Sequence, residues 1–107
     1  MAFYDLYAFQ NKELIDECQL LEEILEVKFR GHDSLFFGTY YLASPVSGCK
    51  ISIKQNFNLH EQEYLEPSFQ QVNILIYVDN APAALAKAYE AKLLTIDKIT
   101  LLRREIL

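Results

Sequence analysis

The sequence predicts a single α+β domain spanning residues 1–107, in which two helices cover one face of a mainly antiparallel five-stranded sheet. Two helical patterns are interleaved with five strand-like patterns, in the order β-α-β-β-β-α-β. The three strand patterns in the middle of the chain are consecutive, which favours an antiparallel meander. The longest apolar run, Val72–Val78, is typical of a central strand covered on both faces. Together these observations predict a two-layer sandwich.

The first part of the chain supplies a strand and the clearest helix. Aromatic residues dominate Phe3–Phe9, which we expect to form the first strand. A helix is expected from Lys12 to about Val27, capped by Asn11 and ended near Gly31. Its apolar stripe repeats at helical spacing through Leu14, Cys18, Leu21 and Leu25.

The middle of the chain predicts a turn followed by two strands. The turn is His32-Asp33-Ser34, and the strands are Leu35–Ala43 and Cys49–Phe57. The second strand alternates, so one set of side chains is expected in the core and the other on the opposite sheet face. The core set is Ile51, Ile53 and Phe57, and the opposite set is Lys50, Ser52, Lys54 and Asn56.

The last part of the chain predicts a helix and a final strand. Asp79 and Asn80 are suitable N-cap residues for a helix that runs to about Leu93, with Pro82 tolerated in its first turn. The segment Lys98–Ile106 is then expected to form the last strand.

Composition restricts the kinds of partner that the protein can have. The formal net charge is −5, which disfavours nucleic acid and suits a basic protein partner.

Cys18 and Cys49 belong to no metal-ligand pattern, so we expect free buried thiols. There is no signal-peptide pattern and no apolar stretch long enough to span a bilayer, so we expect a cytoplasmic protein without a membrane partner.

The most informative segment is Asn58–Gln71, NLHEQEYLEPSFQQ, between two predicted strands. A loop this long in a small domain is usually functional or disordered, and its aromatic residues and Pro67 favour an ordered surface over a flexible linker. Tyrosine beside carboxylates is common in protein recognition surfaces. The predicted partner-binding residues are Glu61, Glu63, Tyr64, Glu66 and Phe69, with Asp33 and Tyr40 as possible neighbours.

Other functions have less support in the sequence. His32 and His60, each beside an acid, leave open a small ligand-binding or metal-binding domain or an enzyme. Lys50 and Lys54 form a small basic patch, but no stacking aromatic residue is apparent beside it and the net charge opposes RNA binding. A homo-oligomer formed by aromatic strands is a further alternative. We expect a monomer without catalytic residues, metal or cofactor.

Two stretches of the chain, within about Leu20–Leu107, resemble a known family. The first contains Gln55-Asn56-Phe57, Glu66-Pro67 with Phe69, and Tyr77-Val78 before a helix. The second contains Phe29, His32, Ser34, Gly38, Tyr40 and Tyr41, and the terminal LLRREIL also fits. These features resemble small bacterial immunity proteins encoded beside polymorphic or contact-dependent growth inhibition toxins.

The resemblance implies a binding protein and not an enzyme. Such immunity proteins bind one cognate toxin in the cytoplasm of the producing bacterium and block its active site or substrate surface. Many of these toxins are nucleases with cationic clefts, which an acidic inhibitor complements in charge. The family does not determine which residues contact the toxin. The predicted partner-binding residues follow only from the acidic and aromatic character of the loop surface.

Overall fold

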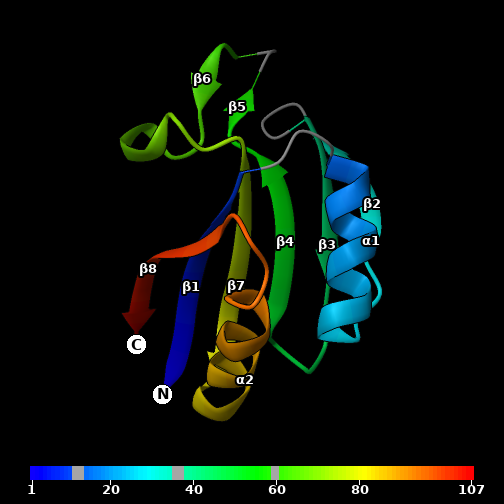
Figure 1. Ribbon diagram of the computed structural model, residues 1–107, viewed down its shortest axis with the longest axis vertical. Coiled ribbons are helices and arrows are strands. Elements are labelled where there is room, and N and C mark those ends of the chain that lie inside the picture. The colour runs from blue at the N-terminus through cyan, green and yellow to red at the C-terminus, as the bar shows by residue number, and fades with distance from the viewer. Residues whose placement is uncertain (11–13, 35–37, 59–60) are drawn as a thin grey trace.

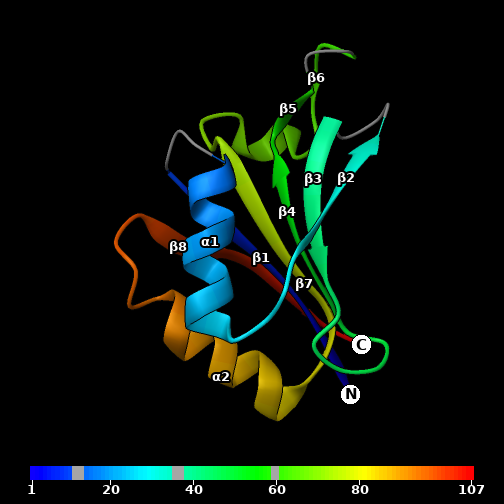
Figure 2. The ribbon, with the colours of Figure 1, turned by 90° about the vertical axis from the view of Figure 1, so that its right-hand side faces the viewer.

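The computed structural model describes residues 1–10, 14–34, 38–58 and 61–107. The elements run in the order β1 (Ala2–Phe9), α1 (Leu14–Leu25), β2 (Arg30–Ser34), β3 (Gly38–Ala43), β4 (Lys50–Gln55), β5 (Phe57–Asn58), β6 (Glu63–Tyr64), a 3-10 turn (Pro67–Phe69), β7 (Ile74–Pro82), α2 (Ala83–Leu93) and β8 (Ile99–Ile106). Both helices lie on the same face of the sheet (Figures 1 and 2). The opposite face is called the open face below.

The main sheet confirms the predicted α+β class and the antiparallel pairing, with a different number of strands. Among the described residues it has six strands in the order β2-β3-β4-β7-β1-β8, and β5 pairs with β6 as a separate small hairpin. The sheet therefore has six strands instead of the predicted five. The predicted meander is confirmed, because β2, β3, β4 and β7 lie side by side in that order. The N-terminal strand β1 then inserts between β7 and β8, so both chain ends lie together in the sheet.

The segment predicted as the turn His32-Asp33-Ser34 is instead part of strand β2. It pairs with β3, with His32 opposite Tyr40 and Ser34 opposite Gly38. Residues with turn propensity occupy a strand here because the neighbouring strand satisfies their backbone groups. The predicted helix ends at Leu25, before Gly31, and Glu26 takes the left-handed conformation (φ 56°) that ends many helices. The predicted cap Asn11 and residues 35–37 lie outside the described residues.

The start of the second helix also differs from the prediction. Asp79 and Asn80 continue strand β7, which pairs with β1 as far as Pro82, and Pro82 itself occupies the N-cap position of α2. The Asn80 amide donates to the Gly48 carbonyl oxygen (3.0 Å), so that side chain holds a loop and does not cap the helix. The predicted end of the helix at Leu93 is confirmed.

The core has two parts, one on each face of the sheet. The larger part lies under the helices and includes Phe3, Tyr7, Leu21, Ile51, Ile53, Ile76 and Leu93. The smaller part lies on the open face, where Leu6, Ala8, Val72 and Leu75 are covered by Leu65, Phe69, Tyr77 and Leu102. The predicted central position of the apolar run is confirmed, because β7 is buried on both faces. Leu65 and Phe69 belong to the segment after β4, so that segment folds back over the open face.

Both cysteine side chains are free and buried among the helix-side core residues. Burial, with a smaller contribution from Glu22, raises the pKa of the Cys18 thiol to about 11. Burial likewise raises the pKa of the Cys49 thiol. Both groups are therefore neutral thiols at physiological pH, which agrees with the predicted packing role.

A buried ion pair joins the two chain ends to the second helix. The Asp5 side chain is 2% exposed and accepts two hydrogen bonds from the Arg104 guanidinium, both 2.8 Å long. Arg104 also pairs with Glu90 of α2 at 2.7 Å. The pair connects β1 to β8 across nearly the whole sequence, and removal of Arg104 would leave the buried Asp5 carboxylate without its charged donor.

We predict that Asp5→Asn destabilises the fold by about 3 kcal/mol, because the amide supplies one acceptor oxygen instead of two and its NH2 group faces the guanidinium at a buried position. Urea unfolding of the variant at pH 7 measures this change. Asp97→Asn, at an exposed position in the turn before β8, is the matched control and should change stability by less than about 0.5 kcal/mol. Equal stabilities for the two variants would show that the pair contributes nothing.

Candidate functional site

The segment that follows β4 is anchored by one buried side chain, that of Asn56. Its amide nitrogen donates to the carbonyl oxygens of Phe69 (2.8 Å) and Val72 (3.0 Å). Its side-chain oxygen accepts from the Glu66 backbone amide (2.9 Å), and its carbonyl oxygen accepts from the Leu65 amide (2.7 Å). Asn56 is fully buried. It closes residues 57–72 into an Ω-shaped loop whose ends meet at one residue.

The sequence predicted different surroundings for two residues at this point. Asn56 was expected on the sheet face away from the core with Ser52, and Phe57 was expected in the core. Ser52 lies on that face, opposite Tyr77, as predicted, whereas Asn56 is fully buried and Phe57 is 37% exposed. The regular alternation fails because the chain bends at Asn56, so Phe57 starts a new strand, β5, outside the main sheet.

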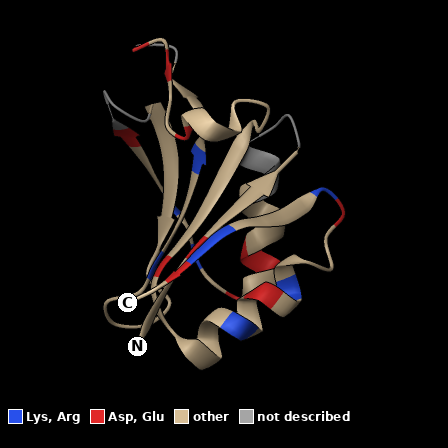
Figure 3. Ribbon diagram, turned by 90° about the vertical axis from the view of Figure 1, so that its left-hand side faces the viewer, with Lys and Arg blue, Asp and Glu red and all other residues tan. Residues whose placement is uncertain are grey.

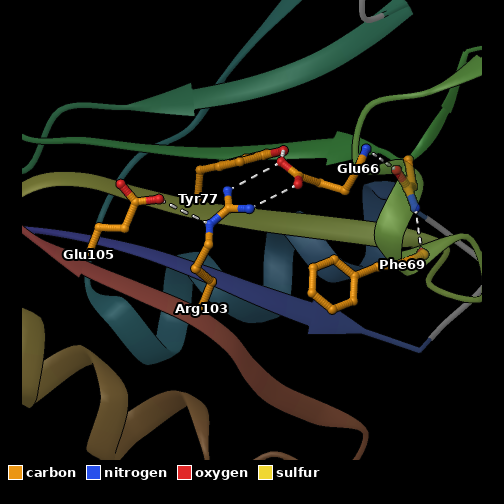
Figure 4. Close-up of polar contacts among 6 residues, drawn as sticks. Glu66, Phe69, Tyr77, Arg103 and Glu105 are labelled. Atoms are coloured by element: carbon orange, nitrogen blue, oxygen red, sulfur yellow. Dashed lines mark hydrogen bonds and ion pairs between the residues drawn. The ribbon is translucent and has the colours of Figure 1, made fainter.

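Glu66 is held by an internal ion pair on the open face (Figure 4). Its carboxylate accepts hydrogen bonds from the Tyr77 hydroxyl (2.7 Å) and from both terminal nitrogens of Arg103 (3.1 and 3.4 Å). Glu105 pairs with the remaining Arg103 nitrogen, Nε, at 3.5 Å. The Glu66 side chain is only 17% exposed. Glu66 therefore fastens the loop to β7 and β8, and its carboxylate is not freely available to a partner.

Phe69 has an internal role as well. It is half-buried and packs with Leu65 against the open-face core residues, above Leu6 and Leu75. Figure 4 shows its ring lying over the sheet beside the Glu66 pair. Two of the five residues predicted in this loop therefore hold the loop on the sheet.

The other three predicted loop residues lie on the β5–β6 hairpin, which projects beyond the end of the main sheet (Figure 1). Phe57 pairs with Tyr64 across the hairpin, and the two rings meet edge to face with centroids 5.0 Å apart. Glu61 and Glu63 are exposed, and the Glu61 amide is bonded to the Asn58 side-chain oxygen at 3.3 Å. We call Phe57, Glu61, Glu63 and Tyr64 the hairpin patch.

Asp33 and Tyr40, the predicted neighbours, lie on β2 and β3 at the same end of the molecule. Asp33 is exposed and accepts a hydrogen bond from the Thr39 hydroxyl (2.9 Å). Figure 3 shows acidic positions at this end, on the hairpin and on the strand beside it. Tyr40 points to the open face, where its ring stacks on His32 with centroids 5.3 Å apart. The predicted set thus divides into the hairpin patch, two loop anchors and two sheet residues.

Sequence reasoning missed a row of rings and a cation across the open face. The Lys54 ammonium lies over the rings of both Tyr40 (5.7 Å) and Tyr77 (5.0 Å). We call His32, Tyr40, Lys54 and Tyr77 the sheet ladder. Burial lowers the pKa of Lys54, an effect that the charge of Asp79 opposes. Strand alternation could have placed these side chains on one face, but the strand order that makes them neighbours required the structure.

The alternative metal or ligand site at His32 and His60 receives no support from the geometry. His32 is exposed on β2 and stacked on Tyr40, while His60 lies outside the described residues. Within the described part of the chain, no three His, Cys, Asp or Glu side chains gather as metal ligands.

The chain matches no protein-family model, no curated protein and no solved structure. In the described residues, neither helix is long and apolar enough to cross a membrane. The hairpin patch is the feature of the structure that bears most directly on function.

We predict that Asn56→Asp destabilises the protein by about 2–4 kcal/mol, because it removes two buried donors and introduces a buried charge. Urea unfolding at pH 7 measures the loss, and nuclear magnetic resonance shows whether the shifts of residues 61–71 change most. The control is Gln55→Glu, the same amide-to-acid change at the exposed neighbour. An Asn56→Asp protein as stable as this control would contradict the anchoring role.

Proposed function

We propose that this protein is an immunity protein that binds a cognate toxin domain and neutralises it in the cytoplasm of the producing bacterium. The protein acts by stoichiometric binding and not by catalysis. The observation that carries the proposal is the hairpin patch, which combines two exposed carboxylates with two aromatic rings on a well-anchored loop. The sequence resemblance to immunity proteins implies the same function.

The anchoring of the loop matters for binding strength. Binding costs free energy for every side chain or loop that must be ordered, and a surface ordered beforehand avoids that cost. Asn56 and the pair between Glu66 and Arg103 fix the base of the loop before any partner arrives. The aromatic pair Phe57–Tyr64 then offers rigid contact area of the kind enriched in binding hot spots.

The charge of the hairpin patch indicates the kind of partner. Glu61 and Glu63 are exposed on the hairpin, and Asp33, near the end of β2, adds a third exposed carboxylate at the same end of the molecule. Carboxylates presented in this way attract a cationic surface and speed association with it. A nuclease cleft, which is basic because it holds phosphates, is the toxin surface that fits best.

The test is co-expression with the toxin domain encoded by the adjacent upstream gene, here taken as the C-terminal domain of its product. Affinity purification should recover a stoichiometric complex, and the toxin domain alone should kill cells that lack this protein. If the purified proteins form no complex and the toxin domain is harmless, the proposal is wrong.

We predict that Glu61→Lys combined with Glu63→Lys weakens that complex by roughly 10- to 100-fold, because both exposed charges are reversed. Glu66 is left unchanged, since its loss would leave Arg103 without its main partner. The control combines Glu23→Lys with Asp97→Lys, which changes net charge equally at exposed positions on α1 and before β8. Isothermal calorimetry compares the two; equal affinities would place the interface elsewhere.

A further inference from the structure

The open face carries a second surface whose charge is opposite to that of the hairpin patch. The sheet ladder crosses β2, β3, β4 and β7, with the Lys54 ammonium between two tyrosine rings. Arg30 shares the strand face of His32, and Lys50 shares that of Lys54, since side chains two residues apart point the same way. Both are exposed. Arg30, Lys50 and Lys54 thus lie on the same side of the sheet as the three rings of the ladder.

The acids of this face are mostly engaged with its own cations. Glu66 and Glu105 both pair with Arg103, at 3.1 and 3.5 Å. Asp79, opposite Lys50 in the register, is half-buried; burial raises its pKa, and the charges of Lys54 and Arg103 oppose that rise. The strands β2, β3 and β4 contribute no further acid to the open face among the described residues, because Asp33 alternates to the other side. The surface over these three strands is therefore basic in a protein of net charge −5.

The orientation of the rings favours a carboxylate-bearing ligand over nucleic-acid bases. His32 stacks against Tyr40 with the ring planes only 23° apart, and Lys54 lies over the Tyr40 ring from the other neighbouring strand. His32 and Lys54 come from the two strands that flank β3 and occupy space that a base would need to stack on Tyr40. The ring edges that remain outward carry the positive part of the aromatic charge distribution. Ring edges and ammonium groups together suit carboxylates.

The sheet ladder adjoins the loop that bears the hairpin patch. Lys54 and Leu65, one from the ladder and one from the loop, line the same open cavity of about 450 Å³. Tyr77 links the ladder to the base of the loop, because its ring lies under Lys54 and its hydroxyl donates to Glu66. A stable protein complex buries roughly 800 Å² on each partner, which a hairpin of two short strands does not provide. The ladder is the adjacent surface that would complete such an area.

We propose that the sheet ladder, with Arg30 and Lys50, docks an acidic segment of the same toxin domain whose basic surface meets the hairpin patch. This inference rests on the proposed function and adds a second, oppositely charged contact. The toxin domain would then carry a basic surface and an acidic segment at a fixed distance from one another. Such a pattern excludes partners that are merely basic, since like charges placed opposite one another oppose binding.

The test measures the affinity of the toxin domain for a variant that combines Arg30→Glu with Lys50→Glu. We expect the dissociation constant to rise roughly tenfold or more, mainly through slower association. The matched control combines Lys87→Glu with Lys98→Glu, an equal charge change at exposed positions on α2 and before β8. The control should bind within about threefold of the unmodified protein. Thermal unfolding of both variants checks that the fold is retained.

The outcomes separate this inference from the proposed function. If the unmodified protein binds no toxin domain, both are wrong. If the hairpin reversal weakens binding while the ladder reversal behaves like its control, only the ladder inference is wrong. A second measurement titrates the free protein with an eight-residue oligouridylate and determines its mass by light scattering. If the oligonucleotide binds at the ladder, this face is an RNA-binding surface and the inference is wrong. If the protein is a dimer that the ladder reversal dissociates, this face serves self-association and the inference is equally wrong.

Discussion

The fold of the functional end of this protein depends on the side chain of Asn56. Its three side-chain hydrogen bonds join the end of β4 to residues 66, 69 and 72, which lie 10 to 16 positions further along the chain. A primary amide suits this position because it offers donors and an acceptor from one small group. The open face is covered as a consequence: Leu65 and Phe69 reach their core partners only when the loop closes at Asn56.

The loop and the sheet also determine how charge is distributed over the molecule. Glu66, drawn onto the sheet by Arg103 and Tyr77, no longer contributes a free charge to the loop. The exposed acids of the loop are then Glu61 and Glu63 on the hairpin, while the cations of β2 and β4 remain on the open face beside it. A net charge of −5 therefore conceals two adjacent surfaces of opposite sign. Recognition by such a pair of surfaces depends on spacing as well as on charge.

Sequence patterns predicted the parts of the fold that local periodicity encodes. The apolar run of β7, the helical stripe through Leu21 and the antiparallel meander follow from repeats of about 3.6 or 2 residues. The patterns failed where a distant partner decides the outcome. Strand β2 forms because β3 pairs with it, and Glu66 is internal because Arg103, 37 residues away, reaches it. Likewise, Asn56 looked like an exposed strand residue, since alternation carries no information about side-chain bonds to a loop.

The most direct test of this account is the rate of amide hydrogen exchange in the loop of the free protein. Asn56 accepts hydrogen bonds from the amides of Leu65 (2.7 Å) and Glu66 (2.9 Å), and the Val72 amide donates to the Phe69 carbonyl oxygen (3.0 Å) within the closed loop. If the loop is fixed before binding, these amides should exchange nearly as slowly as those of β7. Exchange at the rate of unprotected peptides would show that the loop opens freely, and would contradict the claim that the hairpin patch is preorganised.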